Sequence, residues 1–219
     1  MGTGRVGTLL EELYQRLWEA FGPQGWWPGE TPFEVAVGAI LTQNTNWNNV
    51  ALAIRALKDH DLLEPQALHD LPEAELAQLI RPAGYYNIKA RRIKNFLDFL
   101  ANHFGNSLGQ MAAADLSDLR PALLTIKGVG PETADSILLY ALAKPTFVVD
   151  AYTFRILSRH GLIPEACAYE DLRQWFMEHL PAEVDLYQEF HALLVRLGKE
   201  WCRPQPRCAN CPAEGWPGE

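Results

Sequence analysis

Long hydrophobic runs are absent from this sequence. No uninterrupted apolar segment of the 219-residue chain approaches the roughly 20 residues that a membrane-spanning helix requires. Residues 1–7 also lack the apolar core that a secretory signal carries. These two absences predict a cytoplasmic protein without membrane contact.

Positive charge is also scarce. The chain has 19 Lys and Arg against 27 Asp and Glu, a net charge of −8. Non-specific affinity for nucleic acid comes mainly from Lys and Arg that neutralise phosphates, so this balance argues mildly against a nucleic-acid partner. The basic residues are clustered, however. Residues 85–96 contain four of them and no acid, and Arg155, Arg159 and His160 form a second group. A local basic face of this kind suffices for contact with a short stretch of nucleic acid.

Cysteine is rare and the histidines are scattered. Of four cysteines, three lie close together as Cys202, Cys208 and Cys211. In a chain without a secretion signal, such a cluster favours metal or cluster ligation over disulfides. The histidines show no metal-ligand spacing, and we interpret all of them as surface or core residues: His60, His69, His103, His160, His179 and His191.

Alternating strand patterns and low-complexity linkers are missing as well. Ten segments instead place apolar residues at i, i+3 and i+4, the period of a helix: 8–21, 32–42, 47–60, 73–80, 89–104, 116–125, 132–143, 151–160, 170–179 and 186–201. The fold class is therefore predicted to be all-α. We expect a six-helix lobe over residues 28–144. Residues 1–27 and 145–219 are expected to form a second helical lobe that carries a cysteine loop at 202–211, with a cleft between the lobes.

A glycine-rich turn stands between two of the predicted helices. Residues 123–138 indicate a helix, a tight turn and a second helix. Gly128 and Gly130 permit positive φ and close approach, and Pro131 suits a first helical turn. The exposed N–H groups of the second helix would favour an anion such as a phosphate diester. The alternative is a plain turn between helices.

One carboxylate follows an apolar segment at the start of a predicted helix. Residues 146–149 lead directly to Asp150, a position typical of a helix N-cap. A capping carboxylate is held ionised and oriented, so capping is compatible with catalysis.

Residues 123–155 resemble the hairpin and the downstream Asp of the helix-hairpin-helix, Gly/Pro-Asp superfamily of DNA glycosylases typified by endonuclease III. Residues 39–45 resemble the family's helix with a Gln that fills the gap left by an extruded base, and residues 84–90 resemble its second DNA-facing turn. The similarity covers nearly the whole chain. It implies base excision by catalytic Asp150 in a monomer that binds damaged double-stranded DNA. The DNA-contacting residues that it implies are Gln43, Tyr86, Asn87, Lys89, Lys127, Gly128, Gly130 and Thr133.

The residue two positions after the second hairpin glycine bears on strand cleavage. In the endonuclease III branch that also cuts the strand, a Lys there attacks the sugar, whereas this chain has Glu132. Without that amine the lyase reaction lacks its nucleophile, and Lys127 stands on the other side of the turn. We therefore expect a monofunctional glycosylase in which Asp150 stabilises the charge that develops on the sugar and orients or deprotonates water.

Tryptophans suggest the substrate. Trp26, Trp27, Pro28 and Trp47 resemble the base-pocket residues of the 3-methyladenine DNA glycosylase III type, and we assign Glu132 to the same pocket. Indole faces would hold a cationic methylated purine by cation–π attraction, each worth ~0.5–2 kcal/mol. Three alternatives stay open: the tryptophans are core anchors, the enzyme is an endonuclease III-like lyase for oxidised pyrimidines, or the chain is a damaged-DNA-binding module without chemistry.

The cysteine loop resembles the iron-sulfur loop of endonuclease III, with spacing C-x6-C-x2-C-x5-C. Here the first interval is one residue shorter, and Pro217 occupies the fourth ligand position. The resemblance implies a [4Fe–4S] cluster on Cys202, Cys208 and Cys211, whose fourth thiolate is not identified. Cys167 could supply it only if the fold brings that residue near. The alternative is three free thiols.

Overall fold

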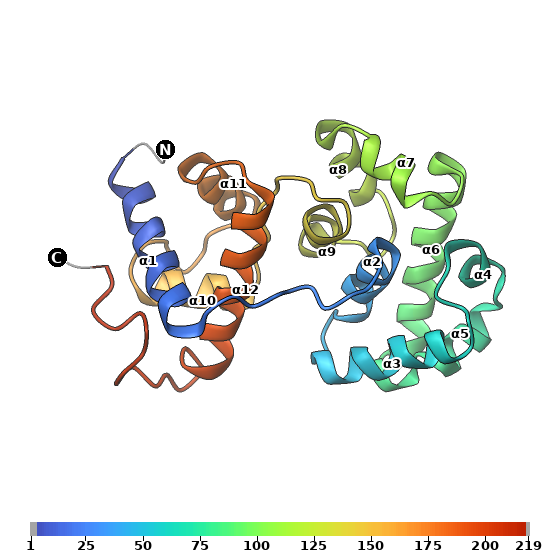
Figure 1. The fold of residues 1–219 in the computed structure, drawn as a ribbon, viewed down its shortest axis with the longest axis horizontal. Helices are drawn as coiled ribbons and strands as arrows, with labels where there is room; N and C mark the ends of the chain where they lie inside the picture. Colours follow the sequence, from blue (N-terminus) through green and yellow to red (C-terminus); the bar gives the residue numbers. More distant parts are fainter. Residues whose placement is uncertain (1–3, 218–219) are drawn as a thin grey trace. The chain divides into compact units, whose positions relative to one another are not determined.

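The computed structural model describes residues 4–217, and within that range every regular element is a helix and none is a strand (Figure 1). The all-α prediction is confirmed. The chain divides into two compact units. One is Trp27–Lys144, and the other takes in the described residues up to Trp26 and those from Pro145 onward. None of the helices in residues 4–217 has the length and apolar character needed to cross a bilayer.

The ten helices expected from periodicity are present, with starts within three residues of the expected positions. They are α1 (Arg5–Phe21), α2 (Pro32–Leu41), α3 (Trp47–Asp59), α5 (Glu73–Leu79), α6 (Tyr86–Phe104), α8 (Leu116–Leu124), α9 (Pro131–Ser136), α10 (Ala151–Arg159), α11 (Tyr169–His179) and α12 (Val184–Glu200). The last turns of the expected 132–143 helix form a π-helix, η2 (Ile137–Ala141), directly after α9.

Two short helices were not expected. They are α4 (Pro65–Asp70) and α7 (Leu108–Ala113), each six residues long, and a short 3-10 helix, η1 (Arg81–Ala83), precedes α6. Six residues are too few to show a repeating apolar face. The described Trp27–Lys144 unit therefore holds eight α-helices, α2 to α9, and the expected number of six is wrong.

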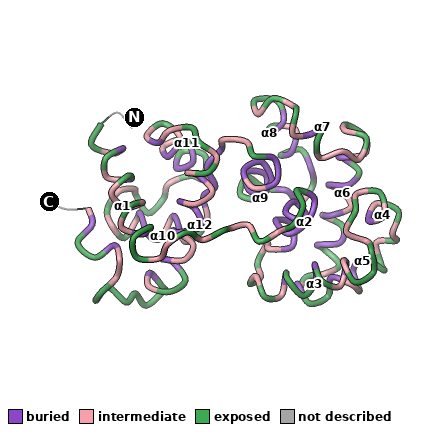
Figure 2. The backbone as a smooth tube through the Cα atoms, viewed as in Figure 1, coloured by how far each residue is buried: buried purple, intermediate pink, exposed green. Residues whose placement is uncertain are grey.

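Helix α2 forms the centre of the Trp27–Lys144 unit. Thr31 caps it by accepting a hydrogen bond from the Glu34 amide (3.1 Å), and Pro32 occupies its first turn. Every residue from Phe33 to Leu41 is buried, and Figure 2 shows the burial along α2 and the adjacent α9. A helix that is buried on all sides is surrounded by other elements. The end of α2 is consequently held at a defined place in the unit.

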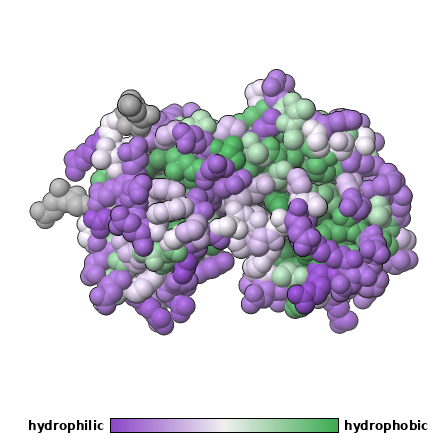
Figure 3. Space-filling view, viewed as in Figure 1, coloured by the Kyte–Doolittle hydropathy of each residue, from purple (hydrophilic) through white to green (hydrophobic). Residues whose placement is uncertain are grey.

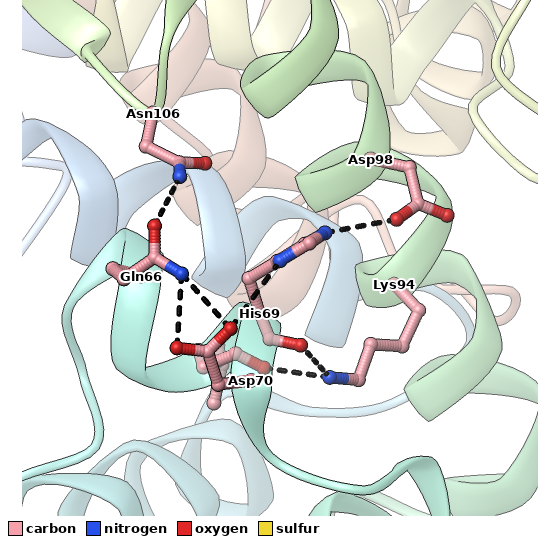
Figure 4. Close-up of polar contacts among 7 residues, drawn as sticks. Gln66, His69, Asp70, Lys94, Asp98 and Asn106 are labelled. Atoms are coloured by element: carbon pink, nitrogen blue, oxygen red, sulfur yellow. Dashed lines mark hydrogen bonds and ion pairs between the residues drawn. The ribbon is translucent and has the colours of Figure 1, made fainter.

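Polar side chains fasten the short α4 to the long α6, as Figure 4 shows. Lys94 on α6 donates to the carbonyls of Leu68 and His69, at 2.8 and 2.6 Å, and His69 Nε2 lies 3.0 Å from an oxygen of Asp98. These contacts satisfy carbonyls at the end of α4 that have no partner within the helix. Elsewhere on this unit the outer side of α3 is covered mainly by hydrophilic side chains (Figure 3).

The second unit is built around an aromatic core. Phe147 stacks on Phe176 with ring centroids 3.9 Å apart and contacts Tyr187 and Phe190 edge to face. These rings are 0 % exposed. Helix α1, from the start of the chain, packs on α12 (Figure 1). Because residues 146–149 are buried in this core, the residue that follows them is rigidly positioned.

Candidate active site and DNA-binding hairpin

The glycine turn forms as expected between α8 and α9. Gly128 has φ +97°, and a Cβ there would come within 2.9 Å of Arg92 Cδ and closer still to Cγ. Both conformation and space therefore require glycine at 128. Gly130 has φ −92°, which any residue adopts, so the expectation of positive φ does not apply to it. No atom lies within 4 Å of where its Cβ would be. A side chain at position 130 would therefore point into open space.

Gln43 lies just beyond α2 and contacts the glycine turn. Its Nε2 donates to the Gly128 carbonyl (3.0 Å) and to Thr133 Oγ1 (2.8 Å), and its Oε1 accepts a hydrogen bond from Arg92 Nη1. Thr133 is buried, and the Lys127 carbonyl accepts a hydrogen bond from Asn95. The structure thus brings together Gln43, Gly128 and Thr133, which are far apart in sequence.

Lys89 is buried, which corrects the expectation that it contacts DNA. Its side chain is 1 % exposed, and Nζ donates to the carbonyls of Leu41 (2.8 Å) and Ala83 (2.7 Å). Desolvation, and secondly the charge of Arg92, lower the pKa of Lys89 to about 8. The expectation failed because Lys89 lies four residues before Ile93 and eight before Leu97, on the buried face of α6, so that its side chain faces the interior.

The turn before α6 exposes two apolar residues that sequence reasoning did not select. Tyr85 has φ +47° and is 68 % exposed, and Ile88 is 52 % exposed. Of the expected contact residues in this segment, Asn87 is exposed and Tyr86 is half-buried with Arg81 over its ring. Large exposed apolar side chains beside a strained turn are typical of an interaction surface.

Three aromatic rings meet within the Trp27–Lys144 unit. Trp27 lies 5.5 Å from Trp47, edge to face, and 5.5 Å from Tyr140 on η2. Gly38 permits this arrangement, because a Cβ there would lie 3.1 Å from Trp27 Nε1. Tyr140 carries no motif that sequence reasoning could use, and only the fold adds it to this cluster.

The remaining expected pocket residues are Trp26, Pro28 and Glu132. Trp26 belongs to the other unit, where Lys199 Nζ lies 5.8 Å from its ring. Within the Trp27–Lys144 unit, Pro28 and Glu132 are exposed, Glu132 in the first turn of α9. The structure therefore brings together Trp27 and Trp47.

Asp150 is the N-cap of α10. Its Oδ1 accepts hydrogen bonds from the Thr153 amide (2.8 Å) and Thr153 Oγ1 (2.9 Å), and Oδ2 lies 3.7 Å from His191 Nε2. The side chains are only 11 % and 8 % exposed. Burial raises the pKa of Asp150, but His191 and Thr153 outweigh burial, so the pKa lies below its usual value. The carboxylate is ionised at neutral pH.

His191 was interpreted as an ordinary surface or core residue. It is buried on α12, as a core residue would be, yet it lies beside the Asp150 carboxylate. No spacing in the sequence signals this contact, because the two residues come together only through the packing of α10 on α12.

The cysteine loop offers three sulfur atoms. Cys202 is buried and its Sγ accepts a hydrogen bond from Arg159 Nη1 at 3.5 Å, whereas Cys208 is exposed. Burial, and then the charges of the other two thiols, raise the pKa of Cys211. Pro217 has no ligating atom, and in residues 4–217 no set of three or more His, Cys, Asp or Glu is arranged to hold a metal ion. Three thiols alone do not meet the four-thiolate requirement of a [4Fe–4S] cluster. The presence of a cluster therefore stays a prediction.

Comparison with known proteins agrees with the geometry. The family described as "HhH-GPD superfamily base excision DNA repair protein" matches residues 37–182. A protein of Methanocaldococcus jannaschii, assigned as a DNA repair glycosylase, is 49% identical over 206 residues, 93% of each chain. Endonuclease III of Thermotoga maritima is 29% identical over 205 residues, which cover 93% of this chain and 89% of that protein.

Solved structures show the same fold. The H. pylori 3-methyladenine DNA glycosylase MagIII, bound to 1,N6-ethenoadenine, superposes with a TM-score of 0.76 at 29% identity over 89% of this chain and 97% of its own. A non-covalent endonuclease III–DNA complex gives a TM-score of 0.77 at 22% identity over 94% and 92% of the two chains, a likeness of fold alone. On this combined sequence and structural similarity, the chain belongs to the HhH-GPD superfamily of base excision DNA repair proteins and is a DNA glycosylase.

Proposed function

We propose that this glycosylase removes alkylated purines such as 3-methyladenine from double-stranded DNA and leaves the strand uncut. The observation that carries the proposal is the aromatic cluster of Trp27, Trp47 and Tyr140. Electron-rich rings attract a cationic base more strongly than a neutral one. The 29% identity to MagIII, which was solved with a modified adenine, supports the same substrate class.

Asp150 carries the chemistry in this proposal. When the bond between base and sugar breaks, its electron pair leaves with the base, and positive charge develops on the sugar. The ionised Asp150 carboxylate, fixed by Thr153 and His191, stabilises that charge. A water molecule oriented by the carboxylate then adds its hydroxide to the sugar carbon, and its proton is passed to the departing base or to solvent.

The available amines support hydrolysis without strand cleavage. Glu132, at the position where the lyase branch carries its Lys, is an exposed acid that cannot form a Schiff base. Lys89 has the lowered pKa of an amine nucleophile, but it lies buried against the carbonyls of Leu41 and Ala83. It cannot reach a sugar from that position.

The hairpin is proposed to bind the DNA backbone. The space where a Cβ on Gly130 would stand is open, which would let a phosphate approach the backbone at the start of α9. Lys127 precedes this turn, and Asn87 lies exposed at the start of α6. Most of these contacts would not read base sequence, as expected of an enzyme that finds damage in any sequence context.

The test measures release of free base from duplex DNA that has been treated with a methylating agent. We expect the wild-type protein to release methylated purine and to produce strand breaks only after alkali. Asp150→Asn should lose base release and keep duplex binding. Asp185→Asn, which neutralises an exposed Asp in the first turn of α12, is the matched control and should remain active. A folded wild-type protein that releases no base from methylated DNA contradicts the proposal.

A second candidate is an endonuclease III-like glycosylase and lyase for oxidised pyrimidines. It is favoured by the cysteine loop and by the 29% identity to the Thermotoga maritima endonuclease III. Borohydride trapping separates the two candidates, because a lyase forms a Schiff base that reduction converts to a stable protein–DNA adduct. We expect no adduct.

A further inference from the structure

Arg92 occupies a central position behind the hairpin. It lies on α6, three residues after Lys89, and its stem packs so closely under Gly128 that no Cβ could fit there. At its far end, Nη1 donates a hydrogen bond to Gln43 Oε1. One side chain therefore contacts both the hairpin backbone and the turn that follows α2.

Gln43 contacts both Arg92 and the hairpin. Its Nε2 donates to the carbonyl of Gly128, the residue that packs on Arg92, and to Thr133 in the first turns of α9. Both ends of the Gln43 amide are thus engaged within the unit. Arg92, Gln43 and Gly128 form a closed ring of contacts.

A second contact from α6 fixes the same region. Lys89 donates to the carbonyl of Leu41, the last residue of α2, two residues before Gln43. The turn that carries Gln43 is consequently held to α6 by Lys89 and by Arg92. The guanidinium is well suited to this task, since its planar group loses little freedom when it forms hydrogen bonds.

We propose that Arg92 is a positioning residue for DNA binding, which couples the Gln43 turn to the hairpin so that the two segments meet the duplex as one preformed surface. This inference rests on the proposed DNA-binding role of the hairpin. Preformed surfaces bind more tightly because ordering does not have to accompany binding. Arg92 acts through Gln43 and Gly128.

The experiment is a double-mutant cycle measured as Kd for a duplex that contains an uncleavable abasic-site analogue. Arg92→Met keeps an aliphatic stem under Gly128 and removes the donor, and Gln43→Met removes the acceptor. We expect Arg92→Met to raise Kd about tenfold. Gln43→Met also removes the bonds from Nε2 to Gly128 and Thr133 and should raise Kd at least as much. The double variant should raise Kd no further than Gln43→Met alone, because the contact with Arg92 is already lost in that variant. At saturating DNA the rate of base release by Arg92→Met should stay within about twofold of wild type.

Arg91→Met is the matched control. It removes the same charge from the same helix, but Arg91 is exposed, pairs with Glu73 and does not touch Gln43. We expect its Kd to change much less. Thermal unfolding of every variant shows whether the fold is retained. If Arg92→Met does not fold, Arg92→Lys, which keeps charge and stem and lacks the planar fork, takes its place, and weaker DNA binding by this variant cannot come from lost charge.

Two results would overturn the proposal. Equal weakening by Arg91→Met and Arg92→Met means that only charge matters. Independent, multiplying effects of the Arg92 and Gln43 substitutions mean that Arg92 does not act through Gln43. Failure of the proposed function gives a different result: the wild-type protein itself then binds no duplex or releases no methylated purine.

Discussion

Replacing His191 should move the acid limb of the pH–rate profile to higher pH. Catalysis in the proposed mechanism needs the Asp150 carboxylate ionised, and the pKa of this group depends on burial, His191 and Thr153. Burial raises the pKa, and His191 and Thr153 lower it. Without the contact between His191 Nε2 and Asp150 Oδ2 at 3.7 Å, burial is opposed by Thr153 alone, so the pKa of Asp150 rises.

The size of the effect follows from the strength of a contact to a buried charge. Hydrogen bonds to charged groups contribute about 1.5–3 kcal/mol, and one pKa unit corresponds to about 1.4 kcal/mol. The contact is longer than a normal hydrogen bond, so we take the lower half of that range. His191→Phe should therefore raise the pKa of Asp150 and move the acid limb to higher pH, and on that limb it should lower the rate of base release about tenfold or more relative to wild type.

The assay is single-turnover base release from methylated duplex DNA, measured from neutral pH down to below the usual pKa of an Asp carboxyl, about 3.9. His191→Gln retains a donor without a charge and should give an intermediate profile. His179→Phe, on α11, is the matched control, because His179 bonds to the Trp175 carbonyl and does not contact Asp150. If the profiles of His191→Phe and wild type superimpose while both proteins are folded, the assigned role of His191 is refuted.

Three further predictions concern the hairpin, the buried lysine and the cysteine loop. Gly128→Ala should destabilise the fold by about 1–3 kcal/mol, because its φ is positive and Arg92 fills the space, whereas Gly130→Ala should leave thermal stability unchanged and weaken duplex binding. The pKa of Lys89 is about 8 in the folded protein and about 10.4 in the unfolded chain. Between these two pH values the unfolded state binds more protons, so the free energy of unfolding of the wild type should rise with pH. Chemical denaturation of Lys89→Met should lack that rise; an unchanged rise would contradict the assignment. The [4Fe–4S] cluster on Cys202, Cys208 and Cys211 stays a prediction that the visible spectrum tests: a brown protein containing iron and sulfide would support it, and a colourless folded protein without iron would contradict it.

The parts of this protein that the sequence determined by itself are those that depend on near neighbours. Helical periodicity and capping act between residues three or four positions apart, which is why the α2 start at Thr31 and the Asp150 cap of α10 were predictable. The resemblance to the family was also visible in such short motifs, and the family model matches residues 37–182. The short α4 and α7 escaped because they contain too few turns for a repeating pattern.

Only the tertiary structure decided which of these residues meet. Gln43 and Gly128 are 85 residues apart, and Arg92 joins them from a third helix. The sequence showed Lys89 as one charge in a basic cluster, but the inward face of α6 buries it. His191 shows no spacing relation to Asp150, yet the packing of α12 on α10 brings it to the carboxylate. The contacts of Gln43 with Gly128 and of His191 with Asp150 depend on how helices pack. Helix packing follows from the fit of whole surfaces and leaves no local pattern in the chain.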